Sequence, residues 1–146
     1  MNIDKKKLSY MVGGLLYSPA INSELADKIA NKTFDCLTSM AFCLEDSIQD
    51  DALEHAEQEV KNTLITLKNK GIKKEDLPLL FVRVRNPEHL LHVNELIGEA
   101  RDILTGYILP KFDPSNGSEY IENIIEINKN DLMEFSVMMN SVRFVK

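Results

Sequence analysis

The sequence predicts an α/β fold built on a parallel sheet. Short apolar segments, rich in β-branched and aromatic residues, alternate with longer segments whose apolar residues recur every three or four positions. Strands separated by helices need crossover connections, and crossovers place successive strands parallel to one another. No internal repeat or low-complexity linker interrupts the 146 residues. We therefore expect one domain over residues 1–146, with residues 1–12 as an N-terminal tail.

Five apolar segments are expected as strands, most of them followed by a turn or by charged residues. The first four are Gly14–Tyr17, about Cys36–Leu44, Leu77–Val84 and about Gly106–Leu109. The last segment, about Leu132–Met139, is a candidate fifth strand, although its methionine-rich stretches favour a helix nearly as well.

Four amphipathic segments are expected as helices. They run from Asn22 or Ser23 to about Lys32, from Asp51 to about Gly71, from Asn86 to about Ala100, and over Glu119–Ile127. Asp51 lies three residues before Glu54, which is the spacing of a capping box. Asn86 precedes Pro87, the order expected of an N-cap followed by a first-turn proline.

Composition excludes several classes of partner. The net charge is −6, and the longest basic block is Lys5-Lys6-Lys7, so a nucleic-acid partner is not expected. No apolar run approaches the ~18 residues of a membrane span, and no secretory signal follows the N-terminal lysines. We expect a cytoplasmic protein without a membrane partner.

The cysteines and histidines do not form a metal-binding pattern. Cys36 and Cys43 flank an apolar segment and are expected to be free thiols. His55 stands alone, and His89 and His92 are three residues apart without the surrounding residues of a known metal motif.

Polar residues gather at the ends of the predicted strands. In parallel β/α folds the carboxyl ends of the strands form one rim, and ligands bind there. The residues expected at this rim are Ser18, Glu45, Asp46, Arg83, Arg85 and Lys111. Arginine recognises carboxylates with two parallel hydrogen bonds, and Asp and Glu oxygens suit Mg²⁺. The set therefore indicates a small acidic substrate, and we expect the acidic pair, Arg83 and Lys111 within roughly 12 Å of a common centre, the size of a ligand pocket.

Two interpretations of these charges remain open. In the functional one, Arg83, Arg85, Lys111 and Ser18 bind the substrate, and Arg83, Glu45 and Asp46 are catalytic. In the structural one, Arg83 and Arg85, which alternate with Val84 and so share one side of the strand, pair with Glu45 and Asp46 as an ion network.

Four motifs in order resemble one known family. They are Gly13–Pro19 (GGLLYSP), Phe42–Ile48 (FCLEDSI), Leu80–Pro87 (LFVRVRNP) and Ile108–Lys111 (ILPK). Together they resemble the citrate lyase β-subunits and HpcH/HpaI aldolases, and most closely the branch of TIM-barrel C–C bond lyases. The resemblance covers Gly13–Phe112, which corresponds to the first half of the family's barrel.

The resemblance implies a fold and a reaction class. The fold would be a partial (half) TIM-type β/α barrel with four to five parallel strands and outer helices. The activity would be a Mg²⁺-dependent carbon–carbon lyase or aldolase acting on 2-oxo or 3-hydroxy acids or their CoA thioesters. By position, Arg83 would hold a substrate carboxylate, Glu45 and Asp46 would lie beside the metal and its waters, and Lys111 would stand at the edge of the pocket.

The sequence departs from the family pattern at the metal ligands. Arg85 is an extra residue that shifts Asn86 by one position, and Asn140 falls where the family has a Glu at the end of the fifth strand. No sixth strand with its Asp follows, so no direct metal ligand is assigned. We expect a truncated chain that is inactive alone, or alternatively a non-catalytic half-barrel that acts as an anion-binding or assembly module.

A half-barrel also predicts self-association. Its two edge strands would carry unpaired backbone groups, and Leu16, Phe42 and Phe81, or their strand neighbours, would be partly uncovered. We expect a homo-oligomer or pairing with a complementary half-barrel.

Overall fold

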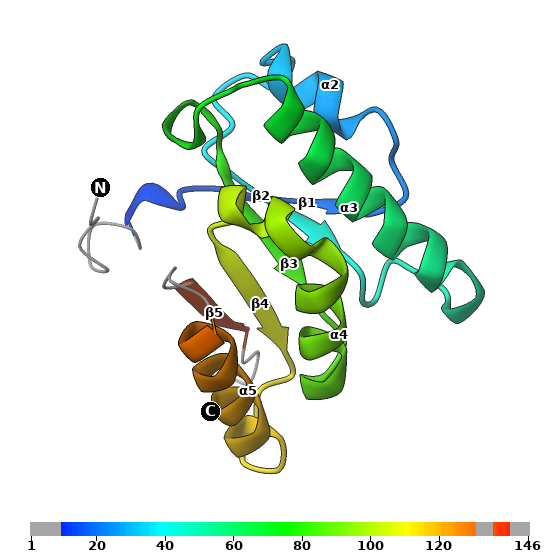
Figure 1. Ribbon diagram of the computed structural model, residues 1–146, viewed down its shortest axis with the longest axis vertical. Helices are drawn as coiled ribbons and strands as arrows, with labels where there is room; N and C mark the ends of the chain where they lie inside the picture. Colours follow the sequence, from blue (N-terminus) through cyan, green and yellow to red (C-terminus); the bar gives the residue numbers. More distant parts are fainter. Residues whose placement is uncertain (1–9, 131–135, 141–146) are drawn as a thin grey trace.

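The computed structural model describes residues 10–130 and 136–140 (Figure 1). It contains a five-stranded sheet in which all neighbouring strands are parallel and the spatial order follows the sequence. The strands are β1 (Leu15–Pro19), β2 (Ser39–Cys43), β3 (Leu79–Arg83), β4 (Gly106–Pro110) and β5 (Ser136–Asn140). β1 and β5 lie at the two edges, and the sheet is not closed. The α/β prediction is confirmed, and the open parallel sheet is consistent with part of a β/α barrel.

Helices follow each of the first four strands. They are α2 (Leu25–Ala30), α3 (Leu53–Asn69), α4 (Pro87–Ile97) and α5 (Gly117–Asn130), with short 3₁₀ turns at η1 (Asp50–Ala52), η2 (Lys74–Asp76) and η3 (Gly98–Ile103). Successive helices pack against one another, α2 on α3, α3 on α4 and α4 on α5. They follow one another around the outside of the sheet (Figure 1), as the crossover connections require.

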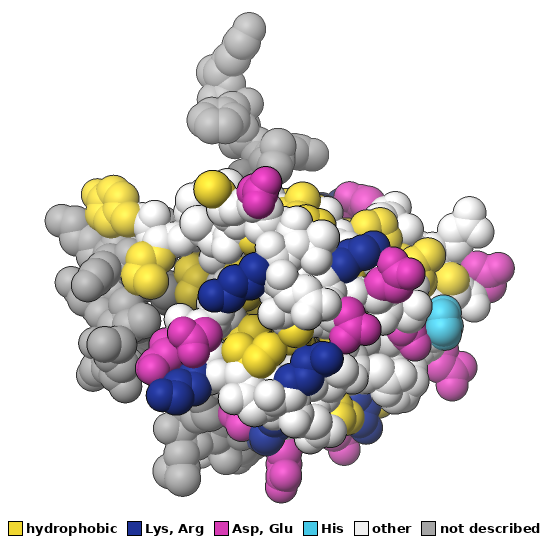
Figure 2. Space-filling view, turned by 90° about the horizontal axis from the view of Figure 1, so that it is seen from above, with side chains coloured by type: hydrophobic (Ala, Val, Ile, Leu, Met, Phe, Trp, Pro, Cys, Tyr) yellow, Lys and Arg dark blue, Asp and Glu magenta, His cyan; other side chains and the backbone are white. Residues whose placement is uncertain are grey.

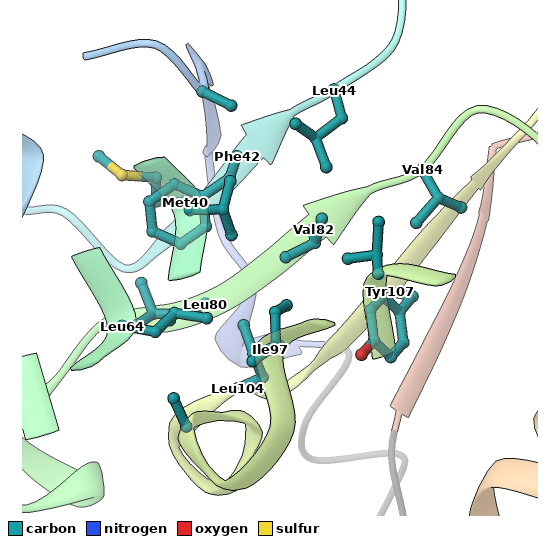
Figure 3. Packing of buried hydrophobic residues seen from close by; sticks show 14 of the residues in the cluster. Met40, Phe42, Leu44, Leu64, Leu80, Val82, Val84, Ile97, Leu104 and Tyr107 are labelled. Carbon is teal, nitrogen blue, oxygen red and sulfur yellow. The ribbon is translucent and has the colours of Figure 1, made fainter. Parts of the chain in front are cut away.

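The main core lies between the sheet and these helices. Alternate strand residues such as Met40, Phe42, Leu80 and Val82 pack in one buried cluster with helical residues such as Leu64 (Figure 3). This alternation is the ordinary two-residue period of a strand, which sends successive side chains to opposite faces.

The opposite face of the sheet carries a second, smaller cluster. Ala41, Phe81 and Ile108 are buried there, and Leu15 is among the partly buried residues that pack on them. The expectation that Phe42 and Phe81 are partly uncovered is therefore wrong, because each is only 1% exposed. Phe42 faces the helices, and Phe81 is covered within the smaller cluster. Leu16, on the edge strand β1, is 38% exposed as expected.

Local backbone geometry explains why β2 starts at Ser39, later than predicted. Cys36 has a φ of 57°, in the left-handed region, which an extended strand cannot accommodate. The Thr38 and Ser39 hydroxyls then donate to the carbonyl of Val12, which ties the segment before β1 to the start of β2. Gly13 has a φ of +56°, and a Cβ there would lie 2.7 Å from the Thr38 hydroxyl, so only glycine fits this junction.

The predicted helix starts differ in accuracy. Asn86 caps α4 as expected, because its side chain accepts the His89 N–H at 2.8 Å and Pro87 is the first helical residue. The prediction of a capping box at Asp51 is wrong, because Ala52 occupies the cap position of α3 and no side chain caps the helix. Asp51 instead belongs to the 3₁₀ turn η1 that precedes the helix.

The other boundaries move by a few residues. The first helix begins at Leu25 and ends at Ala30, and α4 ends at Ile97, so that Ala100 lies in the turn η3. The fifth segment is a strand over Ser136–Asn140. The start of its predicted range, and the Lys5-Lys6-Lys7 block, lie outside the described residues.

Cys36 is exposed, Cys43 is buried, and both are free thiols. Within the described ranges, no helix is both long enough and apolar enough to span a membrane. Acidic and basic side chains are interspersed on the face seen in Figure 2.

The open sheet carries a prediction about assembly. β1 pairs only with β2 among the described strands, so its outer backbone groups lack a strand partner there, and Leu16 and Tyr17 beside them are 38% and 41% exposed. Because such edges pair with other strands, we expect the chain to form dimers at micromolar concentration. Sedimentation velocity checks this, and a species with only the monomer's mass at all concentrations would contradict it.

Candidate functional site

Four charged side chains meet at the carboxyl ends of three neighbouring strands. Glu45 and Asp46 follow β2, Arg83 ends β3, and Lys111 follows β4. Arg83 Nη2 lies 2.7 Å from Glu45 Oε2 and 3.3 Å from Asp46 Oδ2. Lys111 Nζ lies 2.8 Å from Glu45 Oε1 and 3.5 Å from Asp46 Oδ1. These four residues, here called the rim cluster, lie together as the sequence predicted.

Burial divides the rim cluster into a buried pair and an exposed pair. The Glu45 and Arg83 side chains are 7% and 17% exposed, whereas those of Asp46 and Lys111 are 62% and 72% exposed. The Arg83 guanidinium also lies over the Tyr17 ring, 5.6 Å from its centroid, and a cation above an aromatic face is attracted to it. Arg83 is therefore held from two sides, while Lys111 is held only at its ammonium group.

The buried polar atoms of the cluster are not fully hydrogen-bonded. Both Glu45 oxygens are at ion-pair distance from a cation, yet neither has a hydrogen-bond partner of acceptable angle, and Arg83 Nε also has none. Buried polar atoms without such partners are costly and therefore uncommon. The Glu45 oxygens can thus accept hydrogen bonds from a further group, and Arg83 Nε can donate one to it.

Mutual interactions keep the exposed members charged. The close contact with the Glu45 carboxyl group is the main cause that lowers the pKa of Asp46, and the charges of Lys111 and Arg83 add to it. The pKa of Lys111 is raised, first by its close contact with Glu45 and then by the charges of both carboxylates. Asp46 is therefore ionised and Lys111 protonated near neutral pH.

The side-chain contacts described for Arg85 and Ser18 are with groups outside the rim cluster. Arg85 Nε donates to the Leu44 carbonyl at 2.7 Å, Nη2 donates to the Ile48 carbonyl at 2.6 Å, and Nη1 pairs with Asp50. β3 ends at Arg83, so the alternation that would place both arginines on one side does not extend to Arg85. Arg85 fixes the loop between β2 and α3 and leaves Arg83 as the arginine of the cluster.

Ser18 is buried at 8% exposure and paired in register with Phe42, which faces the helices. Its hydroxyl donates a long hydrogen bond, 3.5 Å, to the Pro19 carbonyl.

Tyr120, in the first turn of α5, is a residue that the sequence analysis missed. Its side chain is fully buried and stacks on Phe112, and its hydroxyl has no hydrogen-bond partner in the described residues. Burial raises the pKa of Tyr120 to about 12, and the charges of Glu45 and Glu119 contribute. A neutral phenol donor thus lies within electrostatic reach of the Glu45 carboxylate.

A second polar group joins α3 to α4. The Arg85 N–H donates to His89 Nδ1 at 2.9 Å, so the proton of neutral His89 is on Nε2, which faces Glu57 Oε1 at 2.8 Å. His92 Nε2 lies 3.2 Å from the other Glu57 oxygen. The pair of Glu57 and His89 is buried and was not predicted, because helical spacing within α4 does not reveal a partner on α3.

This group predicts a pH dependence of stability. Burial lowers the pKa of His89 in the folded protein, although Glu57 opposes the effect, so the folded chain binds fewer protons than the unfolded chain, in which His titrates near pH 6.5. The contribution of neutral His89 to the free energy of unfolding is therefore present above about pH 6.5, and it is lost as the pH falls. Between pH 7 and pH 5 we expect the free energy of unfolding to drop by a smaller amount in His89→Gln than in the control His55→Gln. The control changes a histidine at an exposed site. Equal pH slopes in urea titrations would contradict this assignment.

No group of three or more His, Cys, Asp or Glu side chains in the described ranges has the arrangement of a metal site. The rim cluster offers two carboxylates, which is the number that Mg²⁺ sites often use, with waters and substrate oxygens completing the shell. β5 ends at Asn140, whose backbone is in register with Pro110 of β4.

A family model described as the C–C bond lyase of the TIM-barrel fold matches residues 6–142. A search of curated proteins finds no match.

Proposed function

Because the chain belongs to the C–C bond lyase family of the TIM-barrel fold, we propose that its rim cluster binds a small carboxylic acid, together with Mg²⁺, for carbon–carbon lyase chemistry. The proposed ligand class is a 2-oxo or 3-hydroxy acid or its CoA thioester, as in the citrate lyase β-like and HpcH/HpaI relatives that the four motifs resemble. The observation that carries the proposal is the convergence of Glu45, Asp46, Arg83 and Lys111 at one rim, where the buried Arg83 Nε has no hydrogen-bond partner among the described residues.

The residues present fit a divalent cation. Glu45 and Asp46 each offer one oxygen to Lys111, so two hard oxygen donors already surround one cationic position. When bound there, Mg²⁺ would supply a Lewis acid that stabilises the negative charge developing on the enolate oxygen of the departing fragment.

Each residue of the rim cluster has a proposed part. Arg83, fixed between Tyr17 and Glu45, orients a substrate carboxylate with its guanidinium fork. Glu45 and Asp46 hold the cation and its waters, and Lys111 contributes a positive charge at the open side of the site. Arg85 and Ser18 are left out of this assignment. The Arg85 guanidinium binds the β2–α3 loop, and the Ser18 hydroxyl donates to the Pro19 carbonyl.

Substitution of Arg83 by lysine tests the binding role. Lysine keeps the positive charge beside Glu45 but loses the fork, so we expect the affinity for oxaloacetate to fall about tenfold, because one charge-assisted hydrogen bond contributes about 1.5 kcal/mol or more. Isothermal titration calorimetry measures it, with Arg101→Lys as a matched control. If Arg83→Lys and the wild type bind oxaloacetate with equal affinity, the Arg83 guanidinium does not bind the substrate carboxylate.

A second candidate is a non-catalytic, anion-binding or assembly module. Two observations favour it: the charges of Arg83 and Lys111 are neutralised by Glu45 and Asp46, and a neutral residue, Asn140, ends β5. The two candidates share the binding of an acid and differ in the need for Mg²⁺, so calorimetry with oxaloacetate in the presence and absence of Mg²⁺ separates them.

A further inference from the structure

The two cations of the rim cluster occupy equivalent positions between the same two carboxylates. Arg83 Nη2 bridges Glu45 Oε2 and Asp46 Oδ2, and Lys111 Nζ bridges Glu45 Oε1 and Asp46 Oδ1. Each carboxylate thus gives one oxygen to each cation. The position taken by the Lys111 ammonium is the one in which a divalent cation would meet two carboxylate oxygens.

We propose that Lys111 is an internal counter-cation, which holds the position between Glu45 and Asp46 until a divalent cation displaces it and frees its ammonium for an anionic ligand. The proposal rests on the proposed function, since it takes the same two carboxylates as the cation's ligands. It adds an order of events: the metal enters by exchange with Lys111, and the acid follows.

The structure distinguishes which cation leaves. Arg83 is 17% exposed and is held by Tyr17 as well as by the carboxylates, whereas the Lys111 side chain is 72% exposed and is held only at Nζ. A lysine side chain has four rotatable carbon–carbon bonds, so an exposed one can swing away without disturbing its backbone. The backbone is fixed separately, because the Lys111 carbonyl accepts a hydrogen bond from Asn116 Nδ2 at 3.0 Å.

The backbone at Lys111 directs its side chain in an unusual way. Its φ is 49°, in the left-handed region that non-glycine residues seldom adopt. Such conformations persist where the surrounding structure holds them, often at functional sites. This one places the side chain at the end of β4 with Nζ against residues that follow β2, across the intervening strand β3.

The balance of charge explains why displacement leads on to anion binding. Two carboxylates and two cationic side chains cancel one another in the ligand-free cluster. A divalent cation that enters while Lys111 stays would be repelled by the ammonium at close range. Once Lys111 swings out, the rim carries excess positive charge, which an acid with one or two carboxylates neutralises. Metal and acid therefore support each other's binding through Lys111.

The test compares Mn²⁺ affinity among charge variants of the full chain, measured by electron paramagnetic resonance and repeated with Mg²⁺ by calorimetry. Lys111→Met removes the competing ammonium, and we expect it to bind Mn²⁺ about fivefold more tightly than the wild type, the factor that matches one exposed ion pair. Lys111→Arg keeps the charge and should bind as the wild type does. Lys68→Met, which breaks the Lys68–Asp102 pair, is the matched control and should also leave the affinity unchanged.

The outcomes separate this proposal from the proposed function. If Asp46→Asn loses Mn²⁺ binding but Lys111→Met binds no more tightly than the wild type, the counter-cation proposal is overturned while the metal site stands. If no variant binds Mn²⁺, Lys111→Met included, both the counter-cation and the metal assignment are overturned.

Discussion

The variant Arg83→Met is expected to lose about 3 kcal/mol of unfolding free energy, because it leaves a buried carboxylate short of its main counter-charge. Glu45 is 7% exposed and lies 2.7 Å from the Arg83 guanidinium. Lys111 still contacts Glu45 from the open side, so the loss should fall at the lower end of the range for broken buried pairs. For a chain of this size the change corresponds to a fall in Tm of roughly 10 °C.

The double variant Arg83→Met/Glu45→Gln distinguishes charge from packing. Removing the Glu45 charge removes the unpaired ion, so the double variant should recover more than half of the stability lost in Arg83→Met. Urea titrations of the wild type, both single variants and the double variant complete the cycle. Additive losses would show that Arg83 stabilises the fold through its contact with Tyr17 or through packing, and the ion cluster would then have no energetic role.

The second large effect concerns turnover. We expect the 146-residue chain with Mg²⁺ to cleave malyl-, citramalyl- and citryl-type thioesters at a rate hundreds-fold or more below that of an active lyase, the factor that loss of an electrostatic contact in the transition state typically costs. The reason lies at the end of β5: the family resemblance implies a carboxylate there, and the sequence has Asn140 at the end of this strand. Glu45 and Asp46 can still attract a cation, but they also neutralise Arg83 and Lys111.

Coupled assays of product release, run beside calorimetry with oxaloacetate, check this expectation. Binding of the acid without turnover is the result expected of this chain alone. Robust turnover would show that Glu45 and Asp46 suffice as ligands, or that the residue at the end of β5 is not the one that matters.

The features that the sequence predicted well depend on local patterns. Strand–helix alternation and the turn after each apolar segment located four parallel strands, and the Asn86-Pro87 pair located the start of α4. The charges of the rim cluster were also predictable, because a residue directly after a parallel strand must lie at the carboxyl rim. Glu45, Asp46, Arg83 and Lys111 meet for this reason alone.

The features that could not be predicted from the sequence depend on contacts between distant segments. Arg85 was placed in the site by strand alternation, but β3 ends at Arg83 and three acceptors in the β2–α3 loop bind its guanidinium. The pairing of Glu57 with His89 crosses from α3 to α4, and Tyr120 comes near the Glu45 charge only because α5 folds back over the sheet. The left-handed backbone of Lys111 has no signal in the sequence, since lysine rarely adopts it.

The most direct measurement for the central claim, that the rim cluster is the binding site for an acid and a cation, is a crystal structure of the chain with oxaloacetate and Mn²⁺. The account predicts an anomalous Mn²⁺ peak in contact with Glu45 and Asp46, a ligand carboxylate on the Arg83 guanidinium, and the Lys111 ammonium moved from the carboxylates to the ligand. Ligand and metal bound elsewhere, with the four side chains of the rim cluster still paired to one another, would show that the cluster is a structural ion network and would contradict the account.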